Sequence, residues 1–161
     1  MIPVVGATPG LERAIRTTLA SLPPWFVRAA RVARIEVSNR PEVRAQIAQY
    51  AHGTRVLDVS PTVGDVLRKA LYHELAHGID DMGEEAPHYF TSTPEWSRIH
   101  AEQMYFDIPK YAEQPLEYFA DQIAKFLMLG PDKHFTTHPK ESTFIGTWVV
   151  PTLTQAFQET T

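Results

Sequence analysis

Apolar residues along this chain recur mainly at intervals of three and four positions, the spacing of one face of an α-helix. Proline near the first turn and glycine or proline after the last divide this pattern into separate segments. The helices are expected at residues 10–21, from Pro24, 62–82, 94–106, 115–129 and 140–157, the last bent at Pro151. In the 62–82 helix, Thr62 is expected to form the cap and Val63 to face the core.

Apolar and polar residues alternate only between about residues 33 and 60, which predicts β-strands there. Ile35 and Val37 fall on one side of the first strand, with Glu36 and Ser38 on the other. Residues 46–60 are typical of a hairpin around Gly53, and its second strand, Val56–Val59, is expected at the edge of the sheet. Helix, a small group of strands and then mostly helices together predict an α+β fold.

The composition narrows the possible functions. The chain has 161 residues, 43% of them hydrophobic, which suits one domain with a core of its own. A formal net charge of −4 gives no electrostatic basis for nucleic-acid binding. Because there is no cysteine, a metal ion would be bound by histidine, carboxylate and water.

Neither a membrane span nor a secretory signal is expected. The longest apolar runs fall short of the roughly 18 residues that cross a bilayer. The first 16 residues lack a basic start followed by a long apolar stretch. We therefore expect a protein that does not act on membranes and that is cytoplasmic or released by a non-classical or phage/virion route.

The segment "KALYHELAHGID" at residues 69–80 carries the clearest chemical signal. His73 and His77 are four residues apart, so a helix places both imidazoles on one face, where they can bind the same metal ion. Glu74 is rotated by one residue and lies beside that face without being a ligand. This is the arrangement of a catalytic zinc site in which Glu74 is the general base.

A catalytic zinc ion needs a third protein ligand, and the histidines offer several alternatives. The metzincin solution is excluded, because it needs histidine at position 83, which is Gly83, and glycine at position 80, which is Asp80. His88 and His100 remain possible ligands. The pair in "HFTTH", His134 and His138, is expected to lie in a solvent-facing loop.

The acidic pair in "EYFAD" is the better source of the third ligand. Glu117 and Asp121 are four residues apart on the predicted 115–129 helix, at the edge of its apolar face. Glu117 is therefore the expected zinc ligand. Asp121, one turn later, is expected to accept the other ring N–H of a ligand histidine and so fix its orientation.

The combination of "HELAH" with the later "YAEQPLEYFAD" resembles the gluzincins of the anthrax lethal factor family, which include bacterial Pro-Pro endopeptidases. The segment "PEWSRIHAEQ" is similar to that family's connecting helix, and the resemblance covers roughly residues 33–130. It implies a zincin-like fold in which a small sheet packs against the HExxH helix and further helices. It also implies that Tyr111 stabilises the oxyanion, although the spacing from Tyr111 to Glu117 is six and Lys110 stands one position earlier.

These observations predict a single domain over residues 1–161, with an N-terminal helical segment (1–32), a catalytic core (33–130) and a C-terminal helix (131–161). The predicted activity is zinc-dependent hydrolysis of peptide bonds, with one zinc ion per chain and a protein or peptide substrate. A zincin-like binding module without proteolytic activity is the alternative. Substrate identity and cleavage-site specificity do not follow from the sequence.

Overall fold

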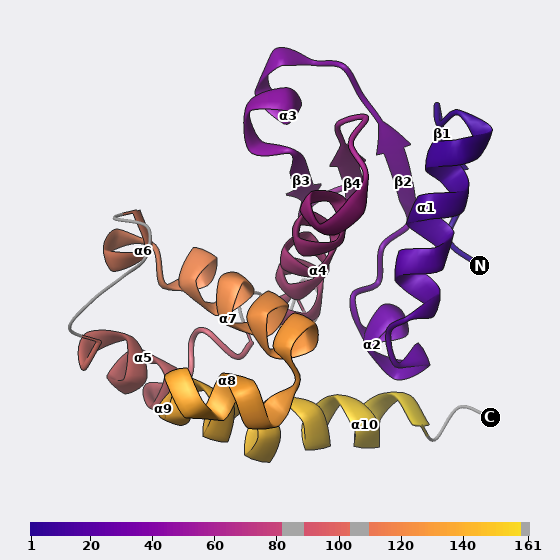
Figure 1. The fold of residues 1–161 in the computed structure, drawn as a ribbon. Helices are drawn as coiled ribbons and strands as arrows, with labels where there is room; N and C mark the ends of the chain where they lie inside the picture. The colour runs from indigo at the N-terminus through magenta and orange to yellow at the C-terminus, as the bar shows by residue number, and fades with distance from the viewer. Residues whose placement is uncertain (82–88, 104–109, 159–161) are drawn as a thin grey trace.

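The structure is a computed structural model that describes residues 1–81, 89–103 and 110–158. The expected α+β fold is confirmed (Figure 1). The strands are β1 (Val4–Val5), β2 (Arg34–Val37), β3 (Ala48–Ala51) and β4 (Val56–Val59). The helices are α1 (Pro9–Ala20), α2 (Pro24–Ala29), α3 (Pro41–Gln46), α4 (Gly64–Asp80), α5 (Pro94–Ala101), α6 (Lys110–Glu113), α7 (Pro115–Leu129), α8 (Pro131–Thr137), α9 (Pro139–Phe144), the π-helical η1 (Ile145–Val149) and α10 (Val150–Gln158).

Within the described residues, the strands form one mixed sheet in the order β1-β2-β4-β3. β1, β2 and β4 are parallel, and β3 pairs antiparallel with β4 through the predicted hairpin. The expectation that Val56–Val59 forms the sheet edge was therefore wrong, because β4 lies inside the sheet and β3 is the edge strand. Strand β1 was not predicted, and it shows that residues 1–32 contribute to the sheet as well as two helices.

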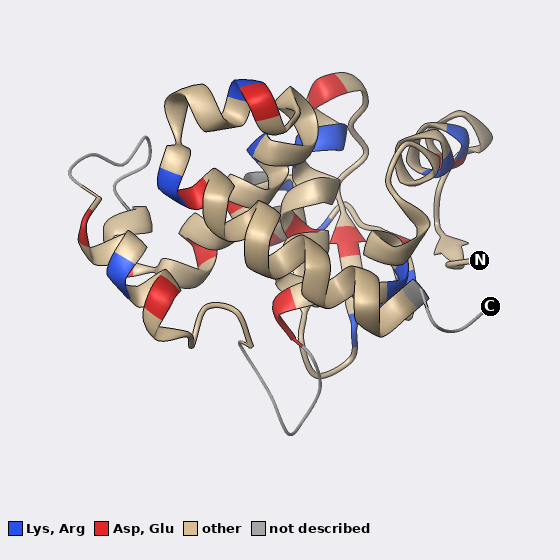
Figure 2. Ribbon diagram, turned by 90° about the horizontal axis from the view of Figure 1, so that it is seen from below, with Lys and Arg blue, Asp and Glu red and all other residues tan. Residues whose placement is uncertain are grey.

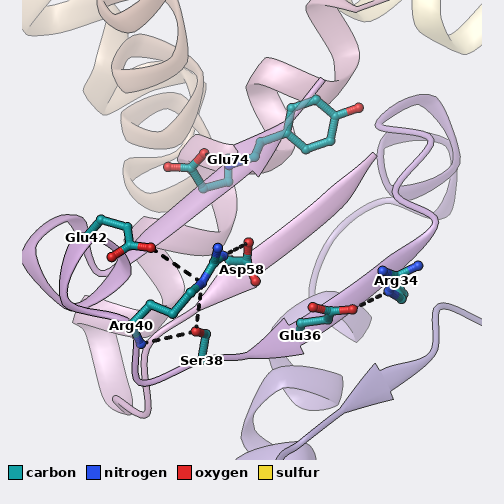
Figure 3. A network of polar contacts seen from close by, with 8 residues as sticks. Arg34, Glu36, Ser38, Arg40, Glu42, Asp58 and Glu74 are labelled. Atoms are coloured by element: carbon teal, nitrogen blue, oxygen red, sulfur yellow. Dashed lines mark hydrogen bonds and ion pairs between the residues drawn. The ribbon is translucent and has the colours of Figure 1, made fainter. Parts of the chain in front are cut away.

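The two faces of the sheet differ in polarity. Ile35, Leu57 and Tyr50 are in register across three strands and are buried in the core. On the opposite face, Asp58 of β4 is paired with Arg40, whose Nε also donates to the Ser38 hydroxyl (Figure 3). One face of the sheet therefore packs against helices, and the other carries a surface network of polar contacts.

Helix α4 lies beside β3 and is the central helix of the fold (Figure 1). Leu67, Leu71 and Leu75 bury its apolar face, as their spacing predicts. A Cβ atom at Gly78 would lie 2.4 Å from the carbonyl oxygen of Ala30, so only glycine permits this close contact with the end of α2. The helix starts later than expected: its N-cap is Val63, not Thr62, and Val63 is 65% exposed and not part of the core.

Helix α7 crosses α4, and aromatic packing anchors its first turn. Trp96 of α5 is fully buried, and its indole N–H donates to the carbonyl of Pro115 at 3.2 Å. Its ring also packs against Phe119, with ring centroids 5.2 Å apart. The helix ends at Gly130, whose φ of +83° is accessible to glycine and strained for other residues. The α5 helix thus positions the end of α7 that carries Glu117.

The chain after α7 departs from the prediction in two ways. Residues 131–158 form α8, α9, η1 and α10 instead of one helix, and the π-helical turn η1 ends two residues before Pro151, where an α-helical N–H is missing. His134 lies on α8 and is fully buried, so its expected place in an exposed loop was wrong. Its Nε2 contacts the amide oxygen of Gln122 on α7 at 3.0 Å, and its ring stacks on His138.

The distribution of charged residues and the apolarity of the helices agree with what the composition predicts. Acidic and basic residues are mixed along the ribbon (Figure 2). Among the described helices, none combines the length and apolarity needed to cross a membrane. The helical stop expected at Gly83 and the helical residues expected at 104–106 lie outside the described residues.

Burial of His134 predicts a specific sensitivity to acid. Burial, with the nearby charges of His138 and Lys125, lowers the pKa of His134 from 6.5 to about 4. Below pH 6.5 the unfolded chain is protonated at His134, whereas the folded protein binds this proton only below about pH 4. The contribution of neutral His134 to the free energy of unfolding is therefore fully present above pH 6.5. It is lost as the pH falls toward 4, which lowers the free energy of unfolding by on the order of 2 kcal/mol.

The measurement is the unfolding free energy of metal-free protein at pH 7 and pH 4.5, which separates this effect from metal release. His134→Gln should lose less stability on acidification than the parent. His138→Gln leaves the buried ring in place but removes one of the charges that lower its pKa, so its loss should lie between those of the parent and His134→Gln. Equal losses in parent and His134→Gln would contradict the assignment.

Candidate metal centre and active-site cleft

The two histidines of "HELAH" lie on one face of α4, one turn apart, as the motif predicts. Their Nε2 atoms are 3.3 Å apart, and the ring centroids are separated by 4.9 Å. His77 is buried and His73 half-buried, so the pair lies where the helix surface passes from the core to a cleft. The geometry of α4 by itself therefore places two imidazole nitrogens next to each other.

Glu117, in the first turn of α7, points its carboxylate at both rings. One oxygen lies 3.3 Å from Nε2 of His73, and the other lies 3.5 Å from Nε2 of His77. These contacts join α4 to α7 across their packing interface, where the two helices run side by side. Residues 44 positions apart in the sequence therefore form one cluster of three donor groups.

The dimensions of this cluster fit a zinc ion. Zinc binds histidine nitrogen and carboxylate oxygen at about 2.0–2.1 Å in tetrahedral geometry, which places neighbouring ligand atoms about 3.3–3.4 Å apart. The two Nε2 atoms are 3.3 Å apart, and two different carboxylate oxygens of Glu117 lie 3.3 Å from Nε2 of His73 and 3.5 Å from Nε2 of His77, all close to that edge length. Two histidines and one glutamate are also the donor set of catalytic zinc sites that keep a position open for water.

Glu74 belongs to the same cluster but has a different partner. A carboxylate oxygen of Glu74 lies within 4.8 Å of ring nitrogens of His73 and His77, so on distance alone it is also a possible ligand. Its Oε2 accepts a hydrogen bond from the main-chain N–H of Tyr50 on β3, at 2.7 Å. The oxygens of Glu117, in contrast, contact both imidazoles directly, which favours Glu117 as the candidate for a third ligand.

A cleft of about 740 Å³ opens over these groups. Helix α4 contributes its floor, with residues of β3 along one side and residues of α6 and α7 along the other. The end of the cleft near the start of α4 contains apolar side chains: Ile47, Val66, Ala70 and Met128. The candidate metal cluster therefore lies in a groove between the edge strand and a helix, with space for an extended chain.

Asp121 is placed as predicted but makes different contacts. It is 1% exposed, on the same side of α7 as Glu117 and one turn later. Its carboxylate contacts Lys69 of α4 at 3.4 Å and Lys125 at 2.9 Å. Among the described residues it forms no hydrogen bond to a histidine ring, so the expected bond to a ligand imidazole is not present.

Tyr111 lines the cleft together with His73 and Glu117. Its side chain is buried, and its main-chain carbonyl accepts a 2.6 Å hydrogen bond from Nε2 of His100. Tyr118 donates its hydroxyl to Glu141 at 2.6 Å, on the side of α7 that packs against α9. Of these two tyrosines, Tyr111 is therefore the one next to the cluster, while Tyr105 lies outside the described residues.

Three other described histidines, His100, His134 and His138, are not among the residues that line the cleft. His100 holds the Tyr111 carbonyl, and His134 is buried under α7. His138 is at the end of α8, stacked on His134. His88 lies outside the described residues.

Two cleft residues were missed by the sequence analysis. His52 follows β3, is 42% exposed in its side chain, and lies 3.4 Å from the Asp81 carboxylate, with its ring beside that of His77. Lys69 lies one turn before His73. The four-residue spacing of Lys69, His73 and His77 was a signal that Lys69 shares their face of the helix, whereas His52 has no motif that marks it.

No protein-family model matches this chain, and no curated protein sequence does. The fold is similar to that of the Pro-Pro endopeptidase PPEP-2 from Paenibacillus alvei, with a TM-score of 0.65. The alignment covers 91% of this chain and 96% of that chain, at 14% sequence identity. At this identity the likeness shows the fold alone, an α+β domain in which a small mixed sheet packs beside helix α4.

The geometry predicts that Glu117 is essential for metal binding. We expect the parent to bind one zinc ion per chain and Glu117→Ala to lose at least about 100-fold in affinity, more than the 10- to 100-fold effect of removing an outer-shell partner. Competition with a fluorescent chelator measures the affinity. Glu113→Ala, an exposed carboxylate on α6, is the matched control. Tight zinc binding by Glu117→Ala would assign the third position to another residue.

Zinc is also expected to stabilise the fold, because its ligands come from two helices that are far apart in the sequence. Binding to the folded state alone raises stability in proportion to the logarithm of ligand concentration over Kd. Removal of zinc should therefore lower the Tm, and added zinc should restore it. The comparison uses thermal scans of the parent and of Glu117→Ala, whose Tm should respond little to zinc.

Proposed function

We propose that this protein is a zinc-dependent endopeptidase of the gluzincin type. The observation that carries the proposal is the triangle of His73, His77 and Glu117, with Glu74 beside it in a cleft along the edge strand. The zincin-like fold and its similarity to a solved Pro-Pro endopeptidase support the same reaction class. In this proposal His73, His77 and Glu117 hold the zinc ion.

A bound zinc ion supplies a polarising charge that lowers the pKa of water to about 7. The residues of this chain carry out the proton transfers. Glu74 accepts the proton of the attacking water and then delivers it to the leaving amine of the cleaved peptide. The hydroxyl of Tyr111 donates to the oxygen on which negative charge develops.

The substrate in this proposal is an extended protein or peptide segment that lies along β3. Gln49, Tyr50 and His52 line that side of the cleft. Edge strands carry main-chain groups that pair with an added chain, and this pairing is independent of side-chain identity. The cleft provides the side-chain preferences of the substrate. No nucleic-acid partner is proposed.

The alternative is a zincin-like binding module that holds peptides without cleaving them. A module of this kind would not require Glu74 to be a proton carrier. The binding module gives the carboxylate of Glu74 beside the two histidines no chemical role, whereas the peptidase uses it as the general base.

Replacement of Glu74 by glutamine separates the two functions. Glutamine retains the shape but cannot accept the proton, so peptide cleavage should fall by about 10²–10⁴-fold. Zinc content and Tm should stay close to parent values. The assay is cleavage of a peptide library with and without chelator, and Glu113→Gln is the matched control. A Glu74→Gln protein as fast as the parent would exclude the proposed mechanism.

Replacement of Tyr111 by phenylalanine tests the oxyanion donor. The ring remains in its buried position and only the hydroxyl is removed. Because the hydroxyl acts on charge that appears in the transition state, kcat should fall by about 10- to 1000-fold while KM and zinc content change little. An unchanged kcat would leave the oxyanion to other groups in the cleft, with His52 as the next residue to replace.

A further inference from the structure

The carboxylate of Glu74 is attached to the sheet as well as to its own helix. Its Oε2 accepts the N–H of Tyr50 at 2.7 Å, and both residues are buried. Figure 3 shows Glu74 beside the β3 strand, above the polar network of Arg40 and Asp58. The donor is a main-chain group, so no sequence motif marks this contact.

The register of the hairpin explains why this N–H faces Glu74. In an antiparallel pair, alternate residues direct both main-chain groups toward the partner strand or away from it. Ser60 donates to the carbonyl of Ile47, so residues 47, 49 and 51 face β4. Ala48 and Tyr50 therefore face the outer edge of the sheet, on the side where α4 lies.

The side chain of Tyr50 holds this donor in place. The ring is part of the hydrophobic core, and burial together with the charge of Asp81 raises the pKa of its hydroxyl to about 12. The phenol therefore stays neutral at all physiological pH values. A buried, uncharged ring fixes the main chain at this position, and with it the direction of the N–H.

We propose that the main-chain N–H of Tyr50 is the positioning group for the general base. It holds Oε2 of Glu74 and so orients the carboxylate that takes up the proton of the attacking water. This inference rests on the proposed function and extends it to the edge strand. A charge-assisted hydrogen bond of this length restricts the carboxylate to one orientation, and a misplacement of about 1 Å in an active site can cost 100-fold in rate.

The test replaces Tyr50 by its α-hydroxy acid through nonsense suppression. This substitution exchanges the N–H for an oxygen and retains the side chain. The matched control replaces Ala48 by lactic acid, which places the same ester on the same edge of β3 at a residue whose N–H is not the donor to Glu74. Any effect of the weaker ester carbonyl is then common to both proteins.

The proposal predicts that the Tyr50 ester lowers kcat by about 10- to 100-fold with little change in KM, zinc content or affinity for a peptide whose scissile amide is a CH2–NH group. The Ala48 ester lacks one of the edge N–H groups proposed to pair with the substrate, so it should raise KM and leave kcat at the parent value. In a Glu74→Gln background, the Tyr50 ester should have no further effect on the residual rate. A Tyr50 ester with the parent kcat would overturn the proposal.

A second readout does not depend on activity. The Tyr50 ester should lower the Tm of metal-free protein more than the Ala48 ester does, and this excess should disappear in a Glu74→Ala background, because the two changes remove the same bond. An excess that persists without Glu74 would overturn the positioning role. A parent that cleaves no peptide while the Tm coupling is present would reject the proposed function and leave the contact as a structural bond.

Discussion

The contact between Glu117 and two imidazoles is the interaction on which the account of this protein depends. Helix α4 supplies His73 and His77, and α7 supplies Glu117. Trp96 holds the first turn of α7 through the hydrogen bond from its indole N–H to the carbonyl of Pro115. Without this packing of α7 on α4, the "HELAH" segment would be two histidines on a helix surface.

The same four-residue spacing continues along both helices. Helix α4 presents His77, His73 and Lys69, while α7, running the other way, presents Glu117, Asp121 and Lys125. Two carboxylates one turn apart repel each other, and the lysines on both sides of Asp121 compensate for that repulsion. Lys69 thus lets α7 carry a second buried carboxylate while Glu117 keeps its contacts with the two histidines.

The carboxylate of Asp80 connects the end of α4 to residues 90 and 91 by hydrogen bonds. It accepts the main-chain N–H groups of Phe90 and Thr91 and the hydroxyl of Thr91. The metzincin pattern requires glycine at this position, followed by a third histidine ligand. Here a buried acid ties the chain back to the helix, and the third donor comes from α7.

Sequence patterns were sufficient where the information is local. Helical periodicity identified α4 and α7, alternation identified the β3–β4 hairpin, and the four-residue spacing placed His73 and His77 on one face of α4. They failed where a neighbour distant in the sequence decides the outcome. The place of β4 inside the sheet depends on its parallel pairing with β2, and the partner of Asp121 depends on Lys69 from another helix. The Tyr50 contact is main-chain and leaves no pattern in side chains.

The most direct test of the central claim is a crystal structure of the zinc-loaded protein with anomalous data on both sides of the zinc edge. The account predicts one strong anomalous peak per chain, bound by Nε2 of His73, Nε2 of His77 and the carboxylate of Glu117, with ligand distances of about 2.0–2.2 Å. Glu74 should remain hydrogen-bonded to Tyr50 and not touch the ion. A peak elsewhere, or one bound by Glu74 in place of Glu117, would contradict the account.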